Sequence, residues 1–546
     1  MPTTFSFIAL FSWPLVVVIL FRLMPLPKAL CWSLVAGYLL LPTRVGMNFP
    51  MLPSIDKSSV PSVAAAVMCL LLAYRDRLEE ARLAGPGRSS DSGVMARLRS
   101  IPRGGAARLT FYALLALLFV SPVATVLSNR EPLVYGPRIL AGLTPYDIGS
   151  MVQGAVIMLL PFMLAMRFLA TSERHVILLR TLVFAALAYS LLVLVEIRLS
   201  PQLHTWLYGF FPHSFAQHTR GGGFRPIVFL SHGLLLAIFL AMAVVSACVL
   251  WRQALRDRIG AAPWLMAAAW LGIVLLLSRN LGASVLMVAF APLALLAPPR
   301  VQILVAAIVA GTVLLFPMAR SAGLVPTEAL VSAAARIDPG RAQSLAFRLR
   351  HEDMLLEKAA EKPLYGWGRW GRNRVYDEET GADQSVTDGA WVIIIGQSGW
   401  IGYIAGFGLM TMPIILLALR RRDQLSPATA GLALVSAVVL VDTIPNAPLT
   451  PVTWLVAGAL AGRYLREEQL VSAPSGPGRA PDPSGTGGPG PWSSGLGEPV
   501  PRHVRRSRGP APGGGTAAMR AATDGTVTGG HQAPAVGRRV RRPMGG

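Results

Sequence analysis

Residues 227–250 read IVFLSHGLLLAIFLAMAVVSACVL, an almost uninterrupted apolar run that is closed by Trp251 and Arg252. A helix needs about 20 mostly apolar residues to cross a bilayer, because about 30 Å of hydrocarbon is spanned at 1.5 Å per residue. This segment therefore predicts a membrane-spanning helix. Many other segments of the chain have the same character, and their number and order determine the fold.

The pattern predicts an all-α polytopic membrane protein with about 12–13 transmembrane helices. The break between residues 278 and 281 is read either as a tight turn between two spans or as a re-entrant turn. The candidate spans are 5–24, 29–45, 58–74, 109–127, 151–170, 176–197, 227–250, 263–278, 281–298, 301–318, 389–418, 428–445 and 451–464.

The composition agrees with a membrane protein. The 546 residues are 53% hydrophobic and only 14% charged, against about 25% charged residues in soluble proteins. The net charge of +22 lies in short runs between apolar segments and in the C-terminal tail, without a basic folded module. We therefore expect contact with anionic membrane lipids and no nucleic-acid partner. The three cysteines do not pair by spacing, and no metal site or cofactor is expected.

Basic residues follow every odd-numbered span, as Arg252, Arg256 and Arg258 follow the seventh. Loops rich in Lys and Arg stay in the cytoplasm. We therefore expect the N-terminus outside and the C-terminus inside. The first span lacks a basic stretch before it and has its first charge, Arg22, after it. We expect it to be retained as a span, since a signal peptide begins with a basic region.

This topology divides the chain into four parts. Residues 1–318 hold ten spans and a basic cytoplasmic linker at 75–108, and residues 319–388 form one large outer loop. Residues 389–464 hold the last three spans. Residues 465–546, rich in Pro, Gly, Ser and Arg, are expected to be a disordered cytoplasmic tail.

Two arginines lie where the topology does not require them. Arg225 stands in GGGFRPIVF at the outer mouth of the seventh span, and Arg279 stands in LLLSRNLGASV between two spans. A charge near hydrocarbon is costly, so it usually faces a cavity. Two guanidinium groups at one outer cavity would suit a phosphate or diphosphate. Alternatively, each reaches lipid phosphates or pairs with a carboxylate.

The outer loop contains a charged helix and a Gly-aromatic turn. Residues 344–362 predict an amphipathic helix that begins with Arg348, Arg350, His351 and Glu352. Residues four apart share a helical face, so Arg348 and Glu352 are expected side by side. This cluster is either part of a site or a solvated, salt-bridged surface.

The turn PLYGWGRWG supplies Trp367 and Trp370. Both could stack on sugar rings or lie in an interfacial aromatic belt. Asp388 ends the loop one residue before the apolar run resumes. It is expected beside the cavity mouth or as the N-cap of the following helix, and the two positions are compatible.

These features together resemble the O-antigen ligase and O-antigen polymerase superfamily of bacterial inner-membrane glycosyltransferases. The resemblance rests on the arginine after a Gly run, the SRN turn, the loop motif R-x-R-H-E-D followed by A-A-E-K-P-L-Y-G-W-G, and WVIIIGQSGWIG. It covers about residues 108–445. This chain has Asp388 where many members carry a histidine.

The resemblance implies transfer of glycan from an undecaprenyl-diphosphate carrier to a glycan or lipid acceptor on the periplasmic side, without a metal or cofactor. Arg225 and Arg279 would then hold the donor diphosphate, with Arg348 and Arg350 beside them. Asp388, or else His351 or Glu352, would accept the proton of the acceptor hydroxyl. The alternative is a transporter or flippase of lipid-linked sugars, which also needs an apolar path and diphosphate-binding arginines.

Overall fold

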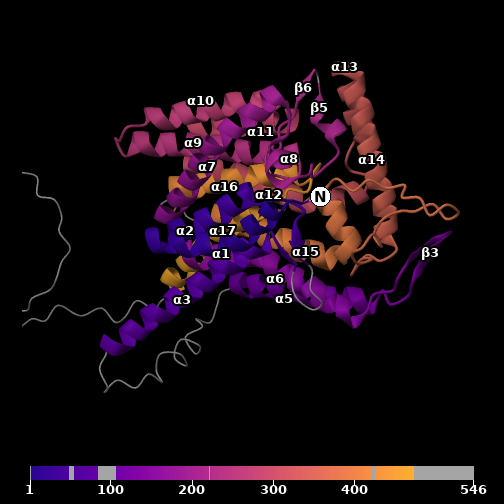
Figure 1. Cartoon of the computed structure of the whole chain (residues 1–546), viewed down its shortest axis with the longest axis horizontal. Coiled ribbons are helices and arrows are strands. Elements are labelled where there is room, and N and C mark those ends of the chain that lie inside the picture. Colours follow the sequence, from indigo (N-terminus) through magenta and orange to yellow (C-terminus); the bar gives the residue numbers. More distant parts are fainter. Residues whose placement is uncertain (1, 48–53, 84–105, 221, 421–424, 473–546) are drawn as a thin grey trace, which may run out of the picture. The chain divides into compact units, whose positions relative to one another are not determined.

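The computed structural model describes residues 2–47, 54–83, 106–220, 222–420 and 425–472. Within these ranges the protein is mostly helical, and all the described helices belong to one unit (Figure 1). Most of the expected basic linker and residues 473–546 of the expected tail lie outside the described residues.

Thirteen of the described helices correspond one by one to the thirteen predicted spans. They are α1 (Thr4–Leu23), α2 (Leu26–Leu40), α3 (Ser59–Leu83), α5 (Ala106–Leu127), α6 (Pro145–Phe168), α7 (Ser172–Leu199), α9 (Gly233–Arg256), α10 (Ala262–Leu277), α11 (Leu281–Leu296), α12 (Pro299–Ser321), α15 (Ala390–Ala418), α16 (Pro427–Asp442) and α17 (Pro451–Ser472). Seven of these are long and apolar enough to cross a membrane. The protein is therefore an all-α polytopic membrane protein.

The helices α10 and α11 form a short hairpin. Each has 16 residues, which gives a length of about 24 Å against about 30 Å of hydrocarbon. The turn between them is Ser278–Asn280, and Arg279 adopts a positive φ of 56° there. A tight turn therefore joins two short helices, and it carries a charged residue close to the level of the hydrocarbon.

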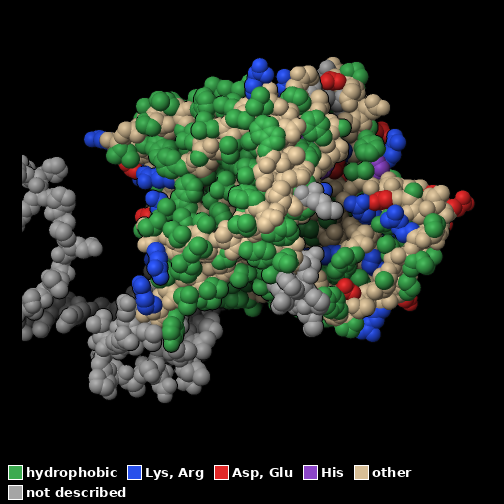
Figure 2. Space-filling view, in the orientation of Figure 1, with side chains coloured by type: hydrophobic (Ala, Val, Ile, Leu, Met, Phe, Trp, Pro, Cys, Tyr) green, Lys and Arg blue, Asp and Glu red, His purple; other side chains and the backbone are tan. Residues whose placement is uncertain are grey.

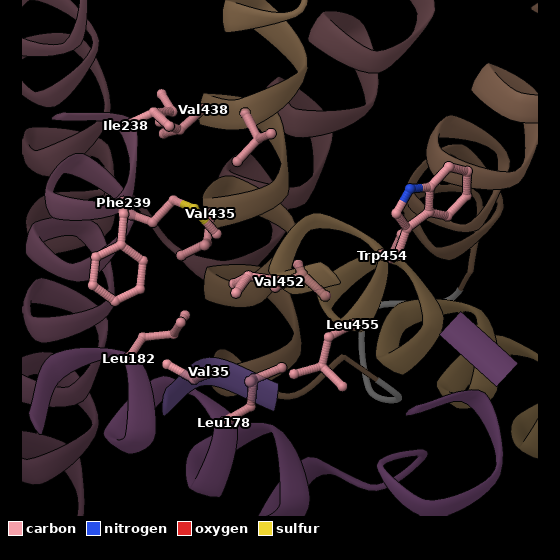
Figure 3. Packing of buried hydrophobic residues seen from close by; sticks show 14 of the residues in the cluster. Val35, Leu178, Leu182, Ile238, Phe239, Val435, Val438, Val452, Trp454 and Leu455 are labelled. Carbon is pink, nitrogen blue, oxygen red and sulfur yellow. The ribbon is translucent and has the colours of Figure 1, made fainter. Parts of the chain in front are cut away.

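The core lies where α2, α7, α9, α16 and α17 meet (Figure 3). Helix α9 is the most enclosed of the seven long apolar helices, since every residue from Leu236 to Leu250 is buried. Leu182, Phe239, Val435 and Leu455 come from four of these helices and pack in one cluster. A helix that is apolar on all sides is expected at the centre of a bundle, which explains why the quoted segment 227–250 occupies this place.

Basic helix ends gather at one end of the bundle. Arg252 of α9 donates to the carbonyl of Ala297 after α11, and Arg300 of α12 donates to the carbonyl of Arg420, 3.4 Å away. The Arg420 guanidinium also lies 4.6 Å from the ring centre of Tyr464 in α17. Hydrophobic side chains cover the middle of the visible face, with Lys and Arg toward its ends (Figure 2). The residues after the seventh, ninth, eleventh and thirteenth spans therefore share one end.

The large loop is folded and lies at the opposite end of the bundle. Its helices are α13 (Thr327–Ile337) and α14 (Pro339–Ala360), so the helix expected at 344–362 begins earlier and ends slightly sooner. The other described elements are α8 (Leu203–Tyr208), the 3-10 helix η1 (Phe215–His218) and the strands β1 (Gly46–Met47), β2 (Ile55–Asp56), β3 (Leu133–Tyr135), β4 (Arg138–Leu140), β5 (Thr219–Arg220) and β6 (Gly223–Phe224). These strands form three antiparallel two-stranded hairpins.

The Gly-aromatic turn of the loop is inserted into a break of α15. Gly399 leaves the helical conformation with φ 64° and ψ −171°. Four backbone hydrogen bonds with the turn replace those lost at the break: Trp367 to Gly396, Gly368 to Gln397, Trp400 to Pro363 and Ile401 to Leu364. A Cβ on Gly399 would lie 2.2 Å from the Leu364 oxygen, and one on Gly366 would lie 2.6 Å from backbone of 397–398. Only glycine allows these two backbones to approach so closely.

Candidate functional site

A cavity of about 490 Å³ lies between the loop helix α14 and the ends of α11 and α16. Arg225, Arg348, Asp442 and Asn446 form its polar side, with Asn280 next to the Arg279 turn. Residues of α11, including Leu281 and Val285, form an apolar wall. Both of these side chains are more than half exposed, as expected for a surface that faces lipid. The cavity surface is thus mainly apolar, with a small polar part beside Arg225 and Arg348.

Arg225 is held in place by an unusual backbone segment that follows it. Val228 has φ 53°, a conformation that a β-branched residue rarely adopts and that costs about 1–3 kcal/mol. The fully buried Glu196 of α7 compensates, because its carboxylate accepts hydrogen bonds from the backbone N–H groups of Ile227 and Val228 at 2.8 and 2.7 Å. The Tyr189 hydroxyl accepts a third, from Phe229 N–H at 2.9 Å. The mouth of α9 is therefore rigidly positioned.

Arg225 and Arg279 both lie against the segment between β5 and α9. The Arg279 guanidinium is so close to Gly223 that an added Cβ would lie 2.6 Å from its central carbon. The aliphatic part of Arg225 packs equally closely on Gly233, and the side chain is buried. The structure therefore brings the two predicted arginines to one region, where Arg225 lines the cavity and Arg279 is exposed outside it, next to the lining residue Asn280.

Arg348 connects the loop helix to the cavity. Its Nε lies 3.4 Å from Oδ2 of Asp388, and its Nη1 donates to the carbonyl of Pro445 at 3.4 Å. The N-cap of α15 is Gly389, without a side-chain capping bond. The alternative that Asp388 caps this helix is therefore wrong, because the helix begins one residue later than such a cap requires. Asp388 instead lies in contact with a cavity arginine.

Glu352 lies one helical turn after Arg348 and is buried, with 8% of its surface exposed. Burial raises the pKa of its carboxyl to about 7, and the nearby Arg320 only partly opposes this effect. Arg320 is instead bonded to Asp353, with 2.5 Å between Nη2 and Oδ1. A carboxyl with a pKa near 7 is suited to accept a proton at neutral pH. Among the three predicted proton acceptors, Glu352 therefore has the most favourable environment.

The other predicted loop residues lie in different surroundings. His351 packs its ring on Phe347, with 4.1 Å between ring centres, and its buried Nδ1 has no hydrogen-bond partner among the described residues. Arg350 is exposed and does not line the cavity. The structure thus brings Arg348, Glu352 and Asp388 together and leaves Arg350 outside this group. Of the three, Arg348 lines the cavity, whereas Glu352 and Asp388 lie behind it.

The two tryptophans of the loop differ. Trp367 is 6% exposed, donates its indole N–H to the carbonyl of Lys358 at 2.7 Å, and has the Lys358 and Lys362 ammonium groups over its ring. It is therefore not available for a sugar, because its surface is used for packing within the loop. Trp370 is 52% exposed and is the one of the pair that can stack on a ligand.

Two acidic residues of the site were not identified from the sequence, namely Glu196 and Asp442. Asp442 lines the cavity, is 7% exposed and accepts a hydrogen bond from Asn446 Nδ2 at 2.7 Å. Both interrupt apolar runs, in VLVEIRL and VLVDTIPN. An ionisable residue inside a predicted span is itself a signal of function, and this signal could have found them.

Histidines that are separated in the sequence also meet near the cavity. The rings of His213, His218 and His232 lie with centres 4.7–5.7 Å apart. His232 accepts a hydrogen bond from Leu234 N–H and so caps α9. No group of His, Cys, Asp or Glu side chains in the described ranges is arranged to hold a metal ion. These histidines therefore contribute to packing around the base of the Arg225 segment.

Comparison with known proteins gives no relative: no family model matches the chain, and no curated protein matches it. The functional argument rests on the geometry of the site and on the residues themselves.

Proposed function

We propose that this protein is a membrane glycosyltransferase that moves glycan from a polyprenyl-diphosphate carrier to an acceptor hydroxyl. The observation that supports it best is the cavity of about 490 Å³ in which Arg225 and Arg348 face an apolar wall of α11. A lipid diphosphate has matching parts, since its charged group needs guanidinium donors and its chain needs an apolar surface.

The proposed reaction has three parts. The bond between the sugar C1 and the diphosphate oxygen breaks, and the diphosphate leaves with the negative charge that Arg225 and Arg279 stabilise. A new bond forms between C1 and the oxygen of the acceptor hydroxyl. The proton of this hydroxyl goes to Glu352, whose pKa of about 7 allows it to act as a base. Asp388 orients Arg348 through their ion pair.

The proposal includes a location. The basic helix ends gather opposite to the loop, and loops rich in Lys and Arg remain in the cytoplasm. We therefore place the loop and the cavity on the outer, periplasmic side of a bacterial inner membrane. A donor carried on undecaprenyl diphosphate and a glycan or lipid acceptor are the proposed partners.

Glycan transfer by the purified full-length protein in lipid nanodiscs tests this function. The protein receives only the lipid-linked donor and an acceptor, and the glycan–acceptor product is measured. We expect transfer by the native protein, no transfer by Glu352→Gln, and normal transfer by Glu357→Gln. Glu357 is a matched control, since it is an exposed carboxylate on the same helix.

Two outcomes would contradict the proposal. Transfer by Glu352→Gln at the native rate would remove Glu352 from the reaction. Movement of intact lipid-linked glycan across vesicles, without cleavage of the bond between sugar and diphosphate, would favour the flippase alternative. Asp388→Asn should lower the rate, because Arg348 loses its ion-pair partner, and should shift the half-maximal pH only slightly downward, because the charge of Asp388 is the smallest of the causes that raise the pKa of Glu352.

A further inference from the structure

A second cavity lies on a different side of the bundle, between α3, α6, α17 and the Gly-aromatic turn. Its volume is about 330 Å³, and many of its lining groups are polar. They include Ser150, Gln153 and Thr450, together with one basic residue, Arg369, and one acidic residue, Asp56. None of these five residues lines the cavity that contains Arg225. The second cavity is therefore a separate place in the fold.

The Arg369 guanidinium has no hydrogen bond or ion pair with the residues that the structure describes. It lies directly against α6, since a Cβ on Gly154 would be 2.9 Å from its Nη1. Trp454 lines the same cavity, and its buried indole N–H also has no acceptor among the described residues (Figure 3). The buried Trp454 N–H calls for a group that accepts a hydrogen bond, and the exposed Arg369 side chain can reach an anionic ligand at the same cavity.

The turn that carries Arg369 is rigid. Arg372, three residues later, donates to the carbonyls of Glu131 and Ala141 at 3.0 and 2.8 Å and so fixes the turn to both sides of the β3–β4 hairpin. Asn129 donates to the Gly366 carbonyl at 2.9 Å. The backbone of such a turn loses little freedom when Arg369 binds a ligand.

Asp56, the acidic residue of the cavity, accepts hydrogen bonds through one of its two carboxylate oxygens. Oδ1 of Asp56 accepts the backbone N–H groups of Ser58 and Ser59, at 2.8 and 3.0 Å, and thereby caps α3. No ion pair joins Asp56 to Arg369 within the described part of the chain. The cavity therefore contains a guanidinium, from Arg369, and a carboxylate, from Asp56, that do not pair with each other.

An apolar groove of about 480 Å³ continues from this cavity, because Ser54, Ser59 and Ile157 line both. The groove runs between α1 and α3 and ends near Met68. Ser59 and Met68 are nine residue steps apart, which corresponds to about 14 Å along α3. Val63 in the groove is 41% exposed, as expected for a side chain that faces lipid.

We propose that the polar cavity and this groove form one binding site for a phospholipid with an ethanolamine-type headgroup. The headgroup phosphate binds Arg369, which matches a phosphate oxygen with a guanidinium donor. The primary ammonium lies beside Asp56, and one acyl chain lies along α1 and α3. The inference does not depend on glycan transfer, so loss of the proposed function would leave it intact.

Lipid binding to the delipidated full-length protein tests this site, with native mass spectrometry as the readout. The probes are phosphatidylethanolamine, phosphatidylglycerol, phosphatidylcholine and soluble phosphoethanolamine. We expect one phosphatidylethanolamine per protein, bound more tightly than the other three probes. Arg369→Ala should weaken it by about ten- to hundredfold, the usual effect of a lost charge-assisted hydrogen bond. Arg336→Ala should have no effect, because Arg336 is exposed on α13.

Two further variants test the two ends separately. Asp56→Asn retains the helix cap, since Asn caps as well as Asp, and should abolish the preference for ethanolamine over glycerol headgroups. Val63→Trp fills the groove and should weaken binding of the lipid without changing binding of soluble phosphoethanolamine. Leu15→Trp changes an exposed position of α1 outside the groove and should leave binding of both ligands unchanged.

Three results would overturn the proposal. Equal lipid binding by Arg369→Ala and the native protein would remove the phosphate contact. A native preference for phosphatidylglycerol or phosphatidylcholine would contradict the role of Asp56. Soluble phosphoethanolamine binding as tightly as the lipid would mean that the groove contributes nothing and that the ligand is not a membrane lipid.

Discussion

The buried carboxyl of Glu352 should make the loop less stable as the pH rises. Its pKa is about 7 in the folded loop and 4.5 ordinarily. Below pH 4.5 the group is protonated in both states and has no effect. Between about pH 4.5 and 7 the opened loop loses the proton first, so the opened state is favoured increasingly, and above about pH 7 the effect is constant. A difference of 2.5 pKa units corresponds to about 3 kcal/mol.

Glu352→Gln removes this loss of loop stability at high pH, because the amide is similar in size to the carboxyl and cannot ionise. At pH 8 we expect the opening free energy of α14 to rise by up to about 3 kcal/mol, or about two orders of magnitude in hydrogen-exchange protection. Hydrogen exchange of peptides from 339–360, corrected for the intrinsic exchange rate at each pH, measures this directly. At pH 5 the gain should be much smaller.

The control is Glu357→Gln, which removes an exposed charge from the same helix and should leave protection unchanged at both pH values. The reasoning would be refuted if Glu352→Gln gave native protection at pH 8. It would equally be refuted if protection of the native loop did not fall between pH 5 and pH 8. The same pKa forecasts that native glycan transfer declines as the pH is lowered through about 7, because the proton acceptor becomes protonated.

Four other predictions can be checked separately. Arg225→Lys and Arg279→Lys keep the charge but lose the bidentate fork, so each should express normally and lose most glycan transfer in the nanodisc assay. Gly399→Ala should lower the free energy of unfolding by about 1–3 kcal/mol, measured by thermal unfolding in detergent, because its Cβ would meet the Leu364 oxygen. Glu378→Cys should react with an impermeant thiol reagent in intact cells, since the native cysteines are buried; reaction only after lysis would place the loop inside. Deletion of 473–546 should leave insertion and transfer nearly intact, and inactivity of the truncated protein would reveal a role for this segment.

The helices could be predicted from the sequence because apolar runs respond directly to the length of the hydrocarbon layer. Each predicted span has a matching helix, usually within a few residues, and Arg225 and Arg279 do approach one segment. Apolar runs and the positions of arginines near their ends were sufficient for these predictions, because both are local features of the sequence.

The remaining features depend on contacts between distant segments. The environment of Trp367 is decided by Lys358 and Lys362, whose side chains cover its ring. Whether Asp388 caps α15 depends on the first residue of this helix. The helix begins one residue later than expected, so Gly389 is at the N-cap. The unusual pKa of Glu352 arises from burial of the loop helix on the bundle. None of these can be obtained from periodicity or composition.

The insertion of the turn 363–368 into the break of α15 limits how the protein can move. Four backbone hydrogen bonds join this turn to a helix that is anchored in the bundle, and the cooperative rupture of such a group is slow and costly. A motion of the loop that widens the cavity must therefore take place in the part of the loop before Pro363. A motion of the arm formed by α13 and α14 would have to break the Arg320–Asp353 and Arg348–Asp388 ion pairs, while the turn after it would keep its position. Arg348 belongs to α14 and would move with this arm, whereas Arg225 would stay with the bundle, so such a motion would change the distance between the two cavity arginines.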